Sequence, residues 1–404
     1  MRLDVIIIVA YFSIYQLIEI DYLREIRMTT RYITLIDETE QTKITAPLES
    51  AWTLPPAAYT DAELFDQETE HLFMKDWMCV ARVEQVAEPG DYLCVDLPRL
   101  PLVISRNLSG ELHALSRVCV HRSMPVIDGS GSATRFVCPY HKWTYELDGR
   151  LRSAPMMQGA DGFSADDCRL PEIQLEVWNG FVFVNADMSA APLSNQLTGL
   201  AAHIQNYDFA SLKITETLYF PSPWNWKILV ENFMEAYHHI GTHKSSLEPI
   251  YPARETAVPD NFGEPWAFLD MPGVAAPDSH ATSFPDLTDA ERQRLFAAVI
   301  FPSFLFAASN EYGVWYQRKP NAHNDMDLYI HLLLRPEYAE TLSTDEMIAM
   351  RATVATVHEE DILANQGPWL GLNSRLTTQG RLSPFEKAIW QLNQHWVERM
   401  AVMS

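Results

Sequence analysis

The stretch Arg117–Trp143, RVCVHRSMPVIDGSGSATRFVCPYHKW, contains two short clips that each pair a cysteine with a histidine. Cys119 and His121 form the first clip and Cys138 and His141 the second, with sixteen residues between them. Zinc fingers usually place two cysteines in one clip and two histidines in the other. Mixed clips instead suit a [2Fe–2S] cluster with two thiolates on one iron and two imidazoles on the other, because each clip then spans both irons. A structural zinc or an incidental grouping is the alternative.

The composition is that of a globular protein with room for two domains. Of the 404 residues, 47% are hydrophobic and 21% are charged. The formal net charge of −23 argues against nucleic acid and anionic membrane surfaces as partners, since both bind surplus Lys and Arg. The five cysteines are odd in number and sparse, which predicts reduced thiols in a cytoplasmic protein rather than a disulfide scaffold.

The N-terminus carries an apolar stretch, VIIIVAYFSIYQLIEI, from Val5 to Ile20. It is shorter than the roughly 20 apolar residues of a bilayer span, and it contains Gln16 and Glu19. No small-residue cleavage site follows it. We expect residues 1–50 to be an N-terminal extension, partly disordered or begun at an over-extended gene start within residues 1–27, and we expect no membrane association.

The pattern along the chain predicts an α+β protein. Residues 61–78 have apolar positions at helical spacing, and residues 79–185 contain short β-rich runs, such as DYLCVDL and GFVFVN, separated by Gly, Pro and Asn. We assign residues 51–186, including this preceding helix, to a small antiparallel β domain. Residues 187–404 form a second domain, with a hairpin from GVWYQRK and MDLYIHLLLR and long helices at 344–366 and 383–400.

A second candidate metal site lies in NWKILVENFMEAYHHIGTH, from Asn225 to His243. Glu231, Glu235, His238 and His243 give the pattern E-x3-E-x2-H-x4-H, in which Glu235 and His238 share a helix face. A regular helix would pair His239 with His243, at i and i+4. Gly241 could instead end the helix and bring His243 to His238. Spacing alone leaves both pairs open.

A helix is predicted through TVHEEDILANQ, Thr356–Gln366, from apolar residues at alternating steps of three and four. Asp361 falls inside that apolar stripe. A lone carboxylate there needs a cation, a donor or a proton. Two histidines and one carboxylate form the ligand set of non-haem iron(II) oxygenases, whereas by itself Asp361 would be an ordinary hydrogen-bonded helix residue.

Both motifs resemble those of a known family. CPYHKWTYELDGRL, from Cys138, is similar to the second cluster loop of Rieske iron–sulfur proteins, and the Asn225–His243 stretch is similar to the mononuclear-iron motif of the Rieske non-haem iron aromatic-ring-hydroxylating oxygenases. The resemblance is to the catalytic α subunit and covers about residues 52–400. It implies an N-terminal Rieske antiparallel β domain and a C-terminal catalytic domain of helix-grip (START-like) fold, with helices covering an antiparallel sheet.

The resemblance also implies two cofactors, with O₂ as co-substrate. The implied ligands are Cys119, His121, Cys138 and His141 for the [2Fe–2S] cluster, and His238, His243 and Asp361 for Fe(II), with His239 only a neighbour. Glu235 and Asn232 of the same motif are the candidate catalytic residues. In the family, the acid at the position of Glu235 bridges a cluster histidine of one subunit, here His141, to an iron-ligand histidine of the next, here His238.

The resemblance further predicts an oxygenase component that takes electrons from a ferredoxin or a flavin-dependent NAD(P)H reductase. We expect it to hydroxylate or dihydroxylate a small aromatic substrate, held beside the aromatic-rich stretch Val299–Gln317. Glu235 departs from the Asp more usual in ring dioxygenases and resembles the branch that oxidises carnitine and choline. The first alternative is therefore a monooxygenase or N- or O-demethylase acting on a quaternary ammonium or alkylamine compound, and the second is an electron carrier without oxygenase activity. We expect a homotrimer, with or without a small β subunit.

Overall fold

The computed structural model describes residues 36–274 and 284–401. The apolar stretch Val5–Ile20, and with it most of the predicted N-terminal extension, lies outside the described residues. Within the described ranges, no helix is long and apolar enough to cross a membrane.

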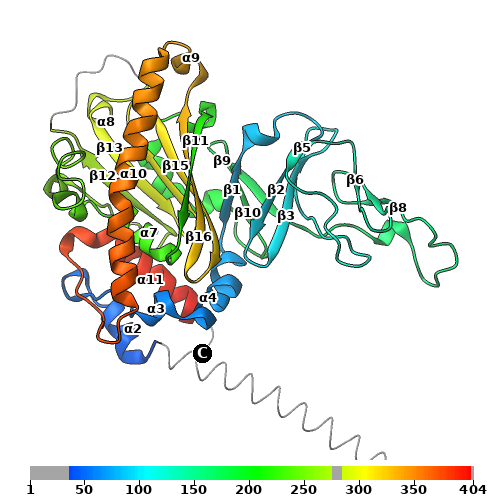
Figure 1. Cartoon of the computed structure of the whole chain (residues 1–404), viewed down its shortest axis with the longest axis horizontal. Coiled ribbons are helices and arrows are strands. Elements are labelled where there is room, and N and C mark those ends of the chain that lie inside the picture. The colour runs from blue at the N-terminus through cyan, green and yellow to red at the C-terminus, as the bar shows by residue number, and fades with distance from the viewer. Residues whose placement is uncertain (1–35, 275–283, 402–404) are drawn as a thin grey trace, which may run out of the picture.

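The β module contains one large antiparallel sheet and a small one at its tip (Figure 1). The large sheet has the strand order β1-β10-β9-β4-β3-β2-β5, and the tip sheet has the order β6-β7-β8. DYLCVDL forms β2 as predicted. The strands are β1 (Met78–Arg82), β2 (Asp91–Leu97), β3 (Leu100–Arg106), β4 (Leu112–Ser116), β5 (Ser130–Ser132), β6 (Phe136–Val137), β7 (Thr144–Tyr145), β8 (Leu151–Ser153), β9 (Glu172–Trp178) and β10 (Phe181–Asn185).

The larger unit is built on a six-stranded antiparallel sheet with the order β11-β16-β15-β14-β13-β12. The predicted hairpin is β15–β16, and its strands run further than expected, so that only His323 and Asn324 connect them. The strands are β11 (Lys213–Ser222), β12 (Trp266–Pro272), β13 (Arg294–Ile300), β14 (Phe304–Ala308), β15 (Gly313–Ala322) and β16 (Asp325–Leu334).

Long helices cover this sheet, and α10 runs along its length in Figure 1. Ser343 and Glu346 form a capping box that starts α10, which continues through Pro368 and so extends beyond the predicted end at residue 366. The helices used below are α2 (Glu38–Ile44), α3 (Ala57–Thr60), α4 (Ala62–Glu68), α7 (Trp226–Phe233), α9 (Pro336–Ala339), α10 (Thr344–Leu372) and α11 (Lys387–Ala401), with the π-helix η2 (Thr69–Phe73) and the 3₁₀ helices η6 (Tyr237–Ile240) and η8 (Pro384–Glu386).

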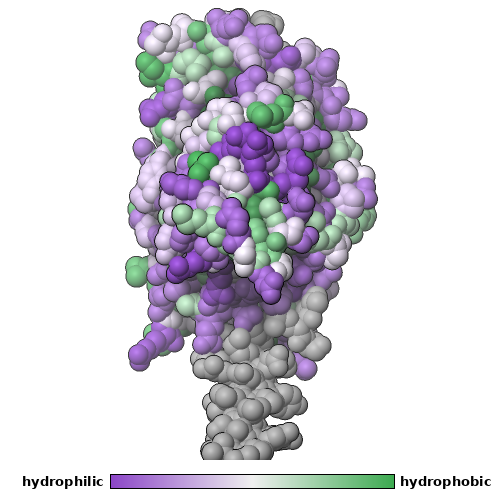
Figure 2. Space-filling model, turned by 90° about the vertical axis from the view of Figure 1, so that its right-hand side faces the viewer, coloured by the Kyte–Doolittle hydropathy of each residue, from purple (hydrophilic) through white to green (hydrophobic). Residues whose placement is uncertain are grey.

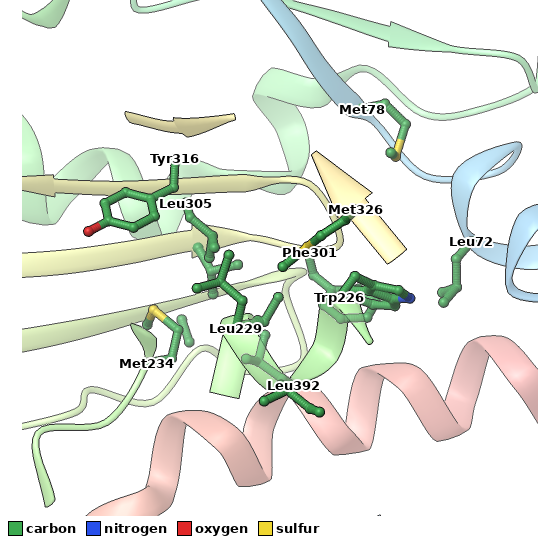
Figure 3. Close-up of a cluster of buried hydrophobic side chains, with 14 of the residues drawn as sticks. Leu72, Met78, Trp226, Leu229, Met234, Phe301, Leu305, Tyr316, Met326 and Leu392 are labelled. Carbon is green, nitrogen blue, oxygen red and sulfur yellow. The ribbon is translucent and has the colours of Figure 1, made fainter. Parts of the chain in front are cut away.

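Helix α7 lies between the sheet and α11 and is almost wholly buried (Figure 3). The Asn225 side chain caps its N-terminus by accepting a hydrogen bond from the Lys227 backbone N–H. Trp226 and Leu229 are each 1% exposed and pack in the main core with Leu392 of α11. Because α7 leads directly into the candidate iron motif, this packing fixes where that motif begins.

The N-terminal helices α2 to α4 pack against the larger unit. Glu68 of α4 is fully buried, accepts a hydrogen bond from Trp226 and pairs with Lys227 at 2.5 Å. Residues 36–50, which we had placed in the extension, also fold here: Trp390 of α11 donates to the Ala46 carbonyl oxygen at 2.8 Å. Sequence periodicity could not reveal these long-range contacts.

Arg82 joins the β module to the larger unit. Its guanidinium is fully buried and donates to the carbonyl oxygens of Phe209 and Leu212, which lie just before β11. It also pairs with Glu84 at 3.1 Å. Gly180 leaves room for this side chain, since a Cβ atom there would lie 2.8 Å from the guanidinium.

The buried network around α7 predicts a pH-dependent stability that Glu231→Gln should remove. Burial raises the pKa of Glu231 from its ordinary 4.5 to about 7, and the charge of Glu386 adds to the rise. The Tyr59 hydroxyl, which donates to Glu231 at 2.5 Å, and the charge of Lys227 oppose this rise. Between pH 4.5 and about 7, Glu231 keeps its proton in the folded protein and releases it in the unfolded chain. The free energy of unfolding should therefore fall as pH rises from 5 to 7, by up to about 1.4 kcal/mol per pH unit.

Chemical denaturation at several pH values measures this slope. We expect the slope to flatten in Glu231→Gln and to persist in the control Glu359→Gln, whose carboxylate is exposed on α10. Parallel curves for wild type and Glu231→Gln would contradict the assignment.

Candidate metal centres

His238, His243 and Asp361 come together in the larger unit, from segments more than a hundred residues apart. One ligand atom from each lies within 4.8 Å of the others, and within the described ranges this is the only such group found. Asp361 Oδ1 lies 3.0 Å from His243 Nε2 and 3.5 Å from His238 Nε2. Donors at about 2.1 Å from a metal ion, in adjacent octahedral positions, lie roughly 3 Å apart. The three residues therefore fit one face of such an ion.

The backbone conformation determines whether His238 or His239 lies beside His243. Helix α7 ends at Phe233, and the chain continues as the 3₁₀ helix η6 (Tyr237–Ile240), so the i,i+4 rule of an α-helix does not apply. His239 turns away and donates its Nδ1 hydrogen to the Tyr251 carbonyl oxygen at 3.1 Å. Burial, together with the charge of His238, lowers the pKa of His239 to about 4, so it remains neutral.

Each ligand histidine is held by a carboxylate behind it. Glu235 Oε1 accepts from His238 Nδ1 at 2.8 Å, and Glu360 Oε2 accepts from His243 Nδ1 at 2.7 Å. Both Nε2 atoms are thereby turned toward Asp361, the arrangement that orients metal-bound imidazoles. Sequence reasoning missed Glu360; its only signal was a position beside Asp361 near the margin of the apolar stripe.

Asn232 lies against the carboxylate ligand. Its Nδ2 donates to Asp361 Oδ1 at 2.9 Å. We named Asn232 as catalytic; its contact with Asp361 supports a positioning role, in which it fixes the carboxylate toward the imidazoles.

The electrostatics of this group favour a cation. Burial by itself would lower the pKa of His238, but hydrogen bonds with Asp361 and Glu235 raise it to about 10. Burial would likewise raise the pKa of Asp361, yet its contacts with His238 and His243 hold it far below its ordinary value. A site that attracts protons this strongly, formed by two imidazoles and a carboxylate, fits a divalent metal ion.

The two Cys–His clips have the same backbone design. In each, the cysteine N–H donates to the carbonyl oxygen five residues on, Cys119 to Met124 and Cys138 to Trp143. The residue four positions after the cysteine has a positive φ, 52° at Ser123 and 62° at Lys142. Each clip is therefore a tight turn, and the two turns face each other at the tip of the β module.

The donor atoms of the clips suit the cluster. Cys119 and Cys138 are each 2% exposed, while the rings of His121 and His141 lie 4.7 Å apart and are half-buried. His141 Nδ1 is buried without a hydrogen-bond partner, as expected of a ligand atom. The Tyr145 hydroxyl lies 3.1 Å from Cys119 Sγ, from where it can donate to a thiolate.

A cavity of about 1130 Å³ opens from the triad into the larger unit. Strands β14 and β15 of the stretch Val299–Gln317 contribute only alternate residues to it, because successive side chains of a strand point to opposite faces. Val314 and Tyr316 of β15 line the cavity, whereas Trp315 packs into a separate core.

Comparison with protein families accounts for both halves of the chain. Residues 76–172 match the Rieske [2Fe–2S] domain, and residues 209–402 match the catalytic domain of the ring hydroxylating alpha subunit. The first match contains both clips, and the second contains the whole triad.

Similar proteins are oxygenase subunits. The carnitine monooxygenase oxygenase subunit of Acinetobacter baumannii is 35% identical over 208 residues, which are 50% of this chain and 55% of that protein. This chain thus matches about half the length of that relative. Choline monooxygenase of Beta vulgaris is 28% identical over 85% of this chain and 76% of its own.

Solved structures agree on the fold. The quaternary ammonium Rieske monooxygenase CntA, in complex with an inhibitor, aligns with a TM-score of 0.77 at 25% identity, over 89% of this chain and 98% of its own. A naphthalene 1,2-dioxygenase aligns with a TM-score of 0.69 at 18% identity over 90% of this chain and 95% of its own, which shows a shared fold alone. The chain therefore belongs to the Rieske non-haem iron oxygenases, as an alpha subunit with a Rieske [2Fe–2S] cluster and a mononuclear iron centre, in a branch with the carnitine and choline monooxygenases.

Proposed function

We propose that this chain is the oxygenase component of a monooxygenase that acts on a quaternary ammonium or related amine compound. The observation that carries the proposal is the His238–His243–Asp361 group at one end of a large, mostly apolar cavity, in a chain that also contains a Rieske domain. An electron carrier would need neither the triad nor the cavity.

The relatives favour the ammonium alternative over our first expectation. Their names specify carnitine, glycine betaine and choline as substrates, and none of these is an aromatic ring. The aromatic residues of the cavity suit this chemistry as well, because ring faces attract quaternary ammonium groups. The expectation of an aromatic substrate thus has no support from the relatives.

The proposed reaction consumes one O₂, two electrons and two protons, converts a C–H bond to C–OH and releases one water. Iron(II) bound by the triad would supply adjacent positions for O₂ and substrate. Glu235 and Glu360 would keep the imidazoles oriented, Asn232 would hold Asp361, and the cavity wall would exclude bulk water. Where the hydroxylated carbon adjoins nitrogen, the product splits into an aldehyde and an amine.

We propose that the electrons arrive from a neighbouring copy of the chain. The tip strands β6 and β8 lie at the opposite end of the molecule from α7 and α10 (Figure 1). Apolar side chains are exposed at this tip, where Figure 2 shows green patches among hydrophilic residues, and Tyr140, beside His141, is 51% exposed. Near Glu235, Ile240 is 54% exposed. A tip that docks beside Glu235 of the next copy would form a head-to-tail ring, closing as a trimer.

The external reductase would reach the cluster from the part of the tip surface that the neighbouring copy leaves exposed. Eight Arg and Lys residues in 99–152 suggest a basic island that attracts an acidic ferredoxin or reductase domain. Five of the eight form ion pairs with acids in the structure, which leaves Arg106, Arg122 and Lys142 as the residues that could carry such steering.

Asp361→Ala should remove the mononuclear iron and spare the cluster. A [2Fe–2S] cluster and one further site together hold about three irons and two labile sulfides per chain. In the variant we expect about two irons, unchanged sulfide and an unchanged Rieske EPR signal after reduction. Iron and sulfide assays measure this. Loss of sulfide in step with iron, or retention of all three irons, would contradict the assignment.

The function itself is tested by turnover. Purified protein, a surrogate reductase, NADH and O₂ are combined with carnitine, choline, glycine betaine and, as the competing class, benzoate and naphthalene. We expect O₂ uptake coupled to a hydroxylated or C–N-cleaved product from an ammonium compound, and none from Asp361→Ala. Coupled oxidation of the aromatic compounds alone would overturn the proposal.

A further inference from the structure

The substrate cavity is long, and its two ends differ in chemistry. Residues of α10 line it from Glu346 to Asp361, and these two positions lie about 22 Å apart along the helix. Asp361 and the ligand histidines lie at one end. The middle is lined by apolar side chains, such as Leu269, Leu295 and Met350. The volume of about 1130 Å³ slightly exceeds the usual range of ligand pockets, roughly 300 to 1,000 Å³.

The end remote from the triad combines a carboxylate with three tyrosines. Glu311 and Tyr312 lie in the turn between β14 and β15, and Tyr338 lies in α9, directly after β16. Because β15 pairs with both β14 and β16, this turn and α9 lie at the same end of the sheet. Tyr251 completes the group from the segment after the iron motif.

The charge of Glu311 reaches all three tyrosine rings. Burial raises the pKa of Tyr338 to about 12, and the charges of Glu311 and Glu346 add to the rise. Burial and Glu311 also raise the pKa values of Tyr251 and Tyr312. The carboxylate and the three hydroxyl-bearing rings therefore lie close enough to act on one ligand.

Among its described residues, the cavity wall contains no guanidinium or ammonium group that could pair with a carboxylate. The acids that line it are Glu235, Glu311, Glu346 and Asp361, and no Lys or Arg is present among the described lining residues. A substrate carboxylate would need a guanidinium or ammonium partner in such an apolar site. Carnitine and glycine betaine carry one, so the wall favours a different ammonium compound.

We propose that Glu311, Tyr251, Tyr312 and Tyr338 form a cation subsite, and that the substrate is an ammonium compound without a carboxylate whose apolar chain extends from this subsite toward the iron ligands. This inference rests on the proposed monooxygenase function and narrows its substrate class. Aromatic faces and a carboxylate together attract a desolvated ammonium group. The carbon that reaches the ligands is then one of the chain, and not one bonded to nitrogen.

Binding of three eight-carbon probes to the purified protein tests the subsite without turnover. We expect octyltrimethylammonium to bind at least about tenfold more tightly than 1-octanol, octanoate or L-carnitine in calorimetric titrations, a difference of about 1.4 kcal/mol or more. Glu311→Gln should weaken binding of the cation about tenfold and leave 1-octanol within about twofold. The control Glu337→Gln removes an acid of α9, beside Tyr338, that does not line the cavity, and should bind like wild type.

Tyr338 offers a second variant should Glu311→Gln fold poorly. Tyr338→Phe keeps the ring and should bind octyltrimethylammonium within about threefold of wild type, whereas Tyr338→Leu should lose about tenfold. Equal binding of cation and alcohol, or wild-type binding by Glu311→Gln and Tyr338→Leu, would overturn the subsite.

Product analysis separates this inference from the function on which it rests. With a reductase, oxidised octyltrimethylammonium that retains its trimethylammonium group supports the subsite, and release of trimethylamine contradicts it. Selective binding without any oxidised product would leave the subsite standing and overturn the function. Equal oxidation of L-carnitine by wild type and Glu311→Gln would support the function and overturn the subsite.

Discussion

The buried carboxylate of Asp361 is the constraint around which the larger unit is organised. It is 7% exposed and lies between two imidazoles, each backed by its own acid, Glu235 or Glu360. Such a concentration of negative charge is costly in an apolar interior unless a cation balances it. The fold holds the group together from both sides: the segment that follows α7 carries the two histidines, and α10 carries Asp361 and Glu360.

Local features of the sequence place these elements. The Asn225 cap starts α7, and the capping box of Ser343 and Glu346 starts α10. Between α7 and His243 the chain leaves the α-helix for a 3₁₀ turn, and this change brings His238 and His243 together. A continued α-helix would have presented His239, which instead donates to the Tyr251 carbonyl oxygen.

Patterns of short range were predictable from the sequence, and long-range contacts were not. The mixed Cys–His clips, the β2 strand and Asp361 within an apolar helical stripe follow from spacing and periodicity. The choice of His238 over His239 depended on the family resemblance, because spacing alone allowed both. Glu360, the Glu68–Lys227 pair and the packing of α2 to α4 on the larger unit depend on tertiary contacts that no local pattern encodes.

The two candidate metal centres of one chain lie at opposite ends of the molecule, which is why we propose that assembly is part of the chemistry (Figure 1). A cluster at the tip of the β module cannot easily serve the iron ligands beside α7 and α10 of its own chain (Figure 1). One solved relative, a quaternary ammonium Rieske monooxygenase, has been described in terms of inter-subunit electron transfer. In this chain, the proposed ring would bring a neighbour's cluster close to Glu235, and Glu360 makes the equivalent contact to the other ligand histidine.

Single-turnover kinetics test most directly whether electrons pass from the cluster to a separate iron through Glu235. The measurement compares the variants Glu235→Gln and Glu360→Gln. Both variants alter one carboxylate behind one ligand histidine, so both perturb ligand orientation alike. With matched iron content, pre-reduced protein is mixed with O₂ and substrate, and cluster reoxidation is followed by absorbance. The account predicts reoxidation slowed at least about a hundredfold in Glu235→Gln, equivalent to about 2.7 kcal/mol, and less than about tenfold in Glu360→Gln. Equal rates in the two variants, or wild-type reoxidation in Glu235→Gln, would contradict it.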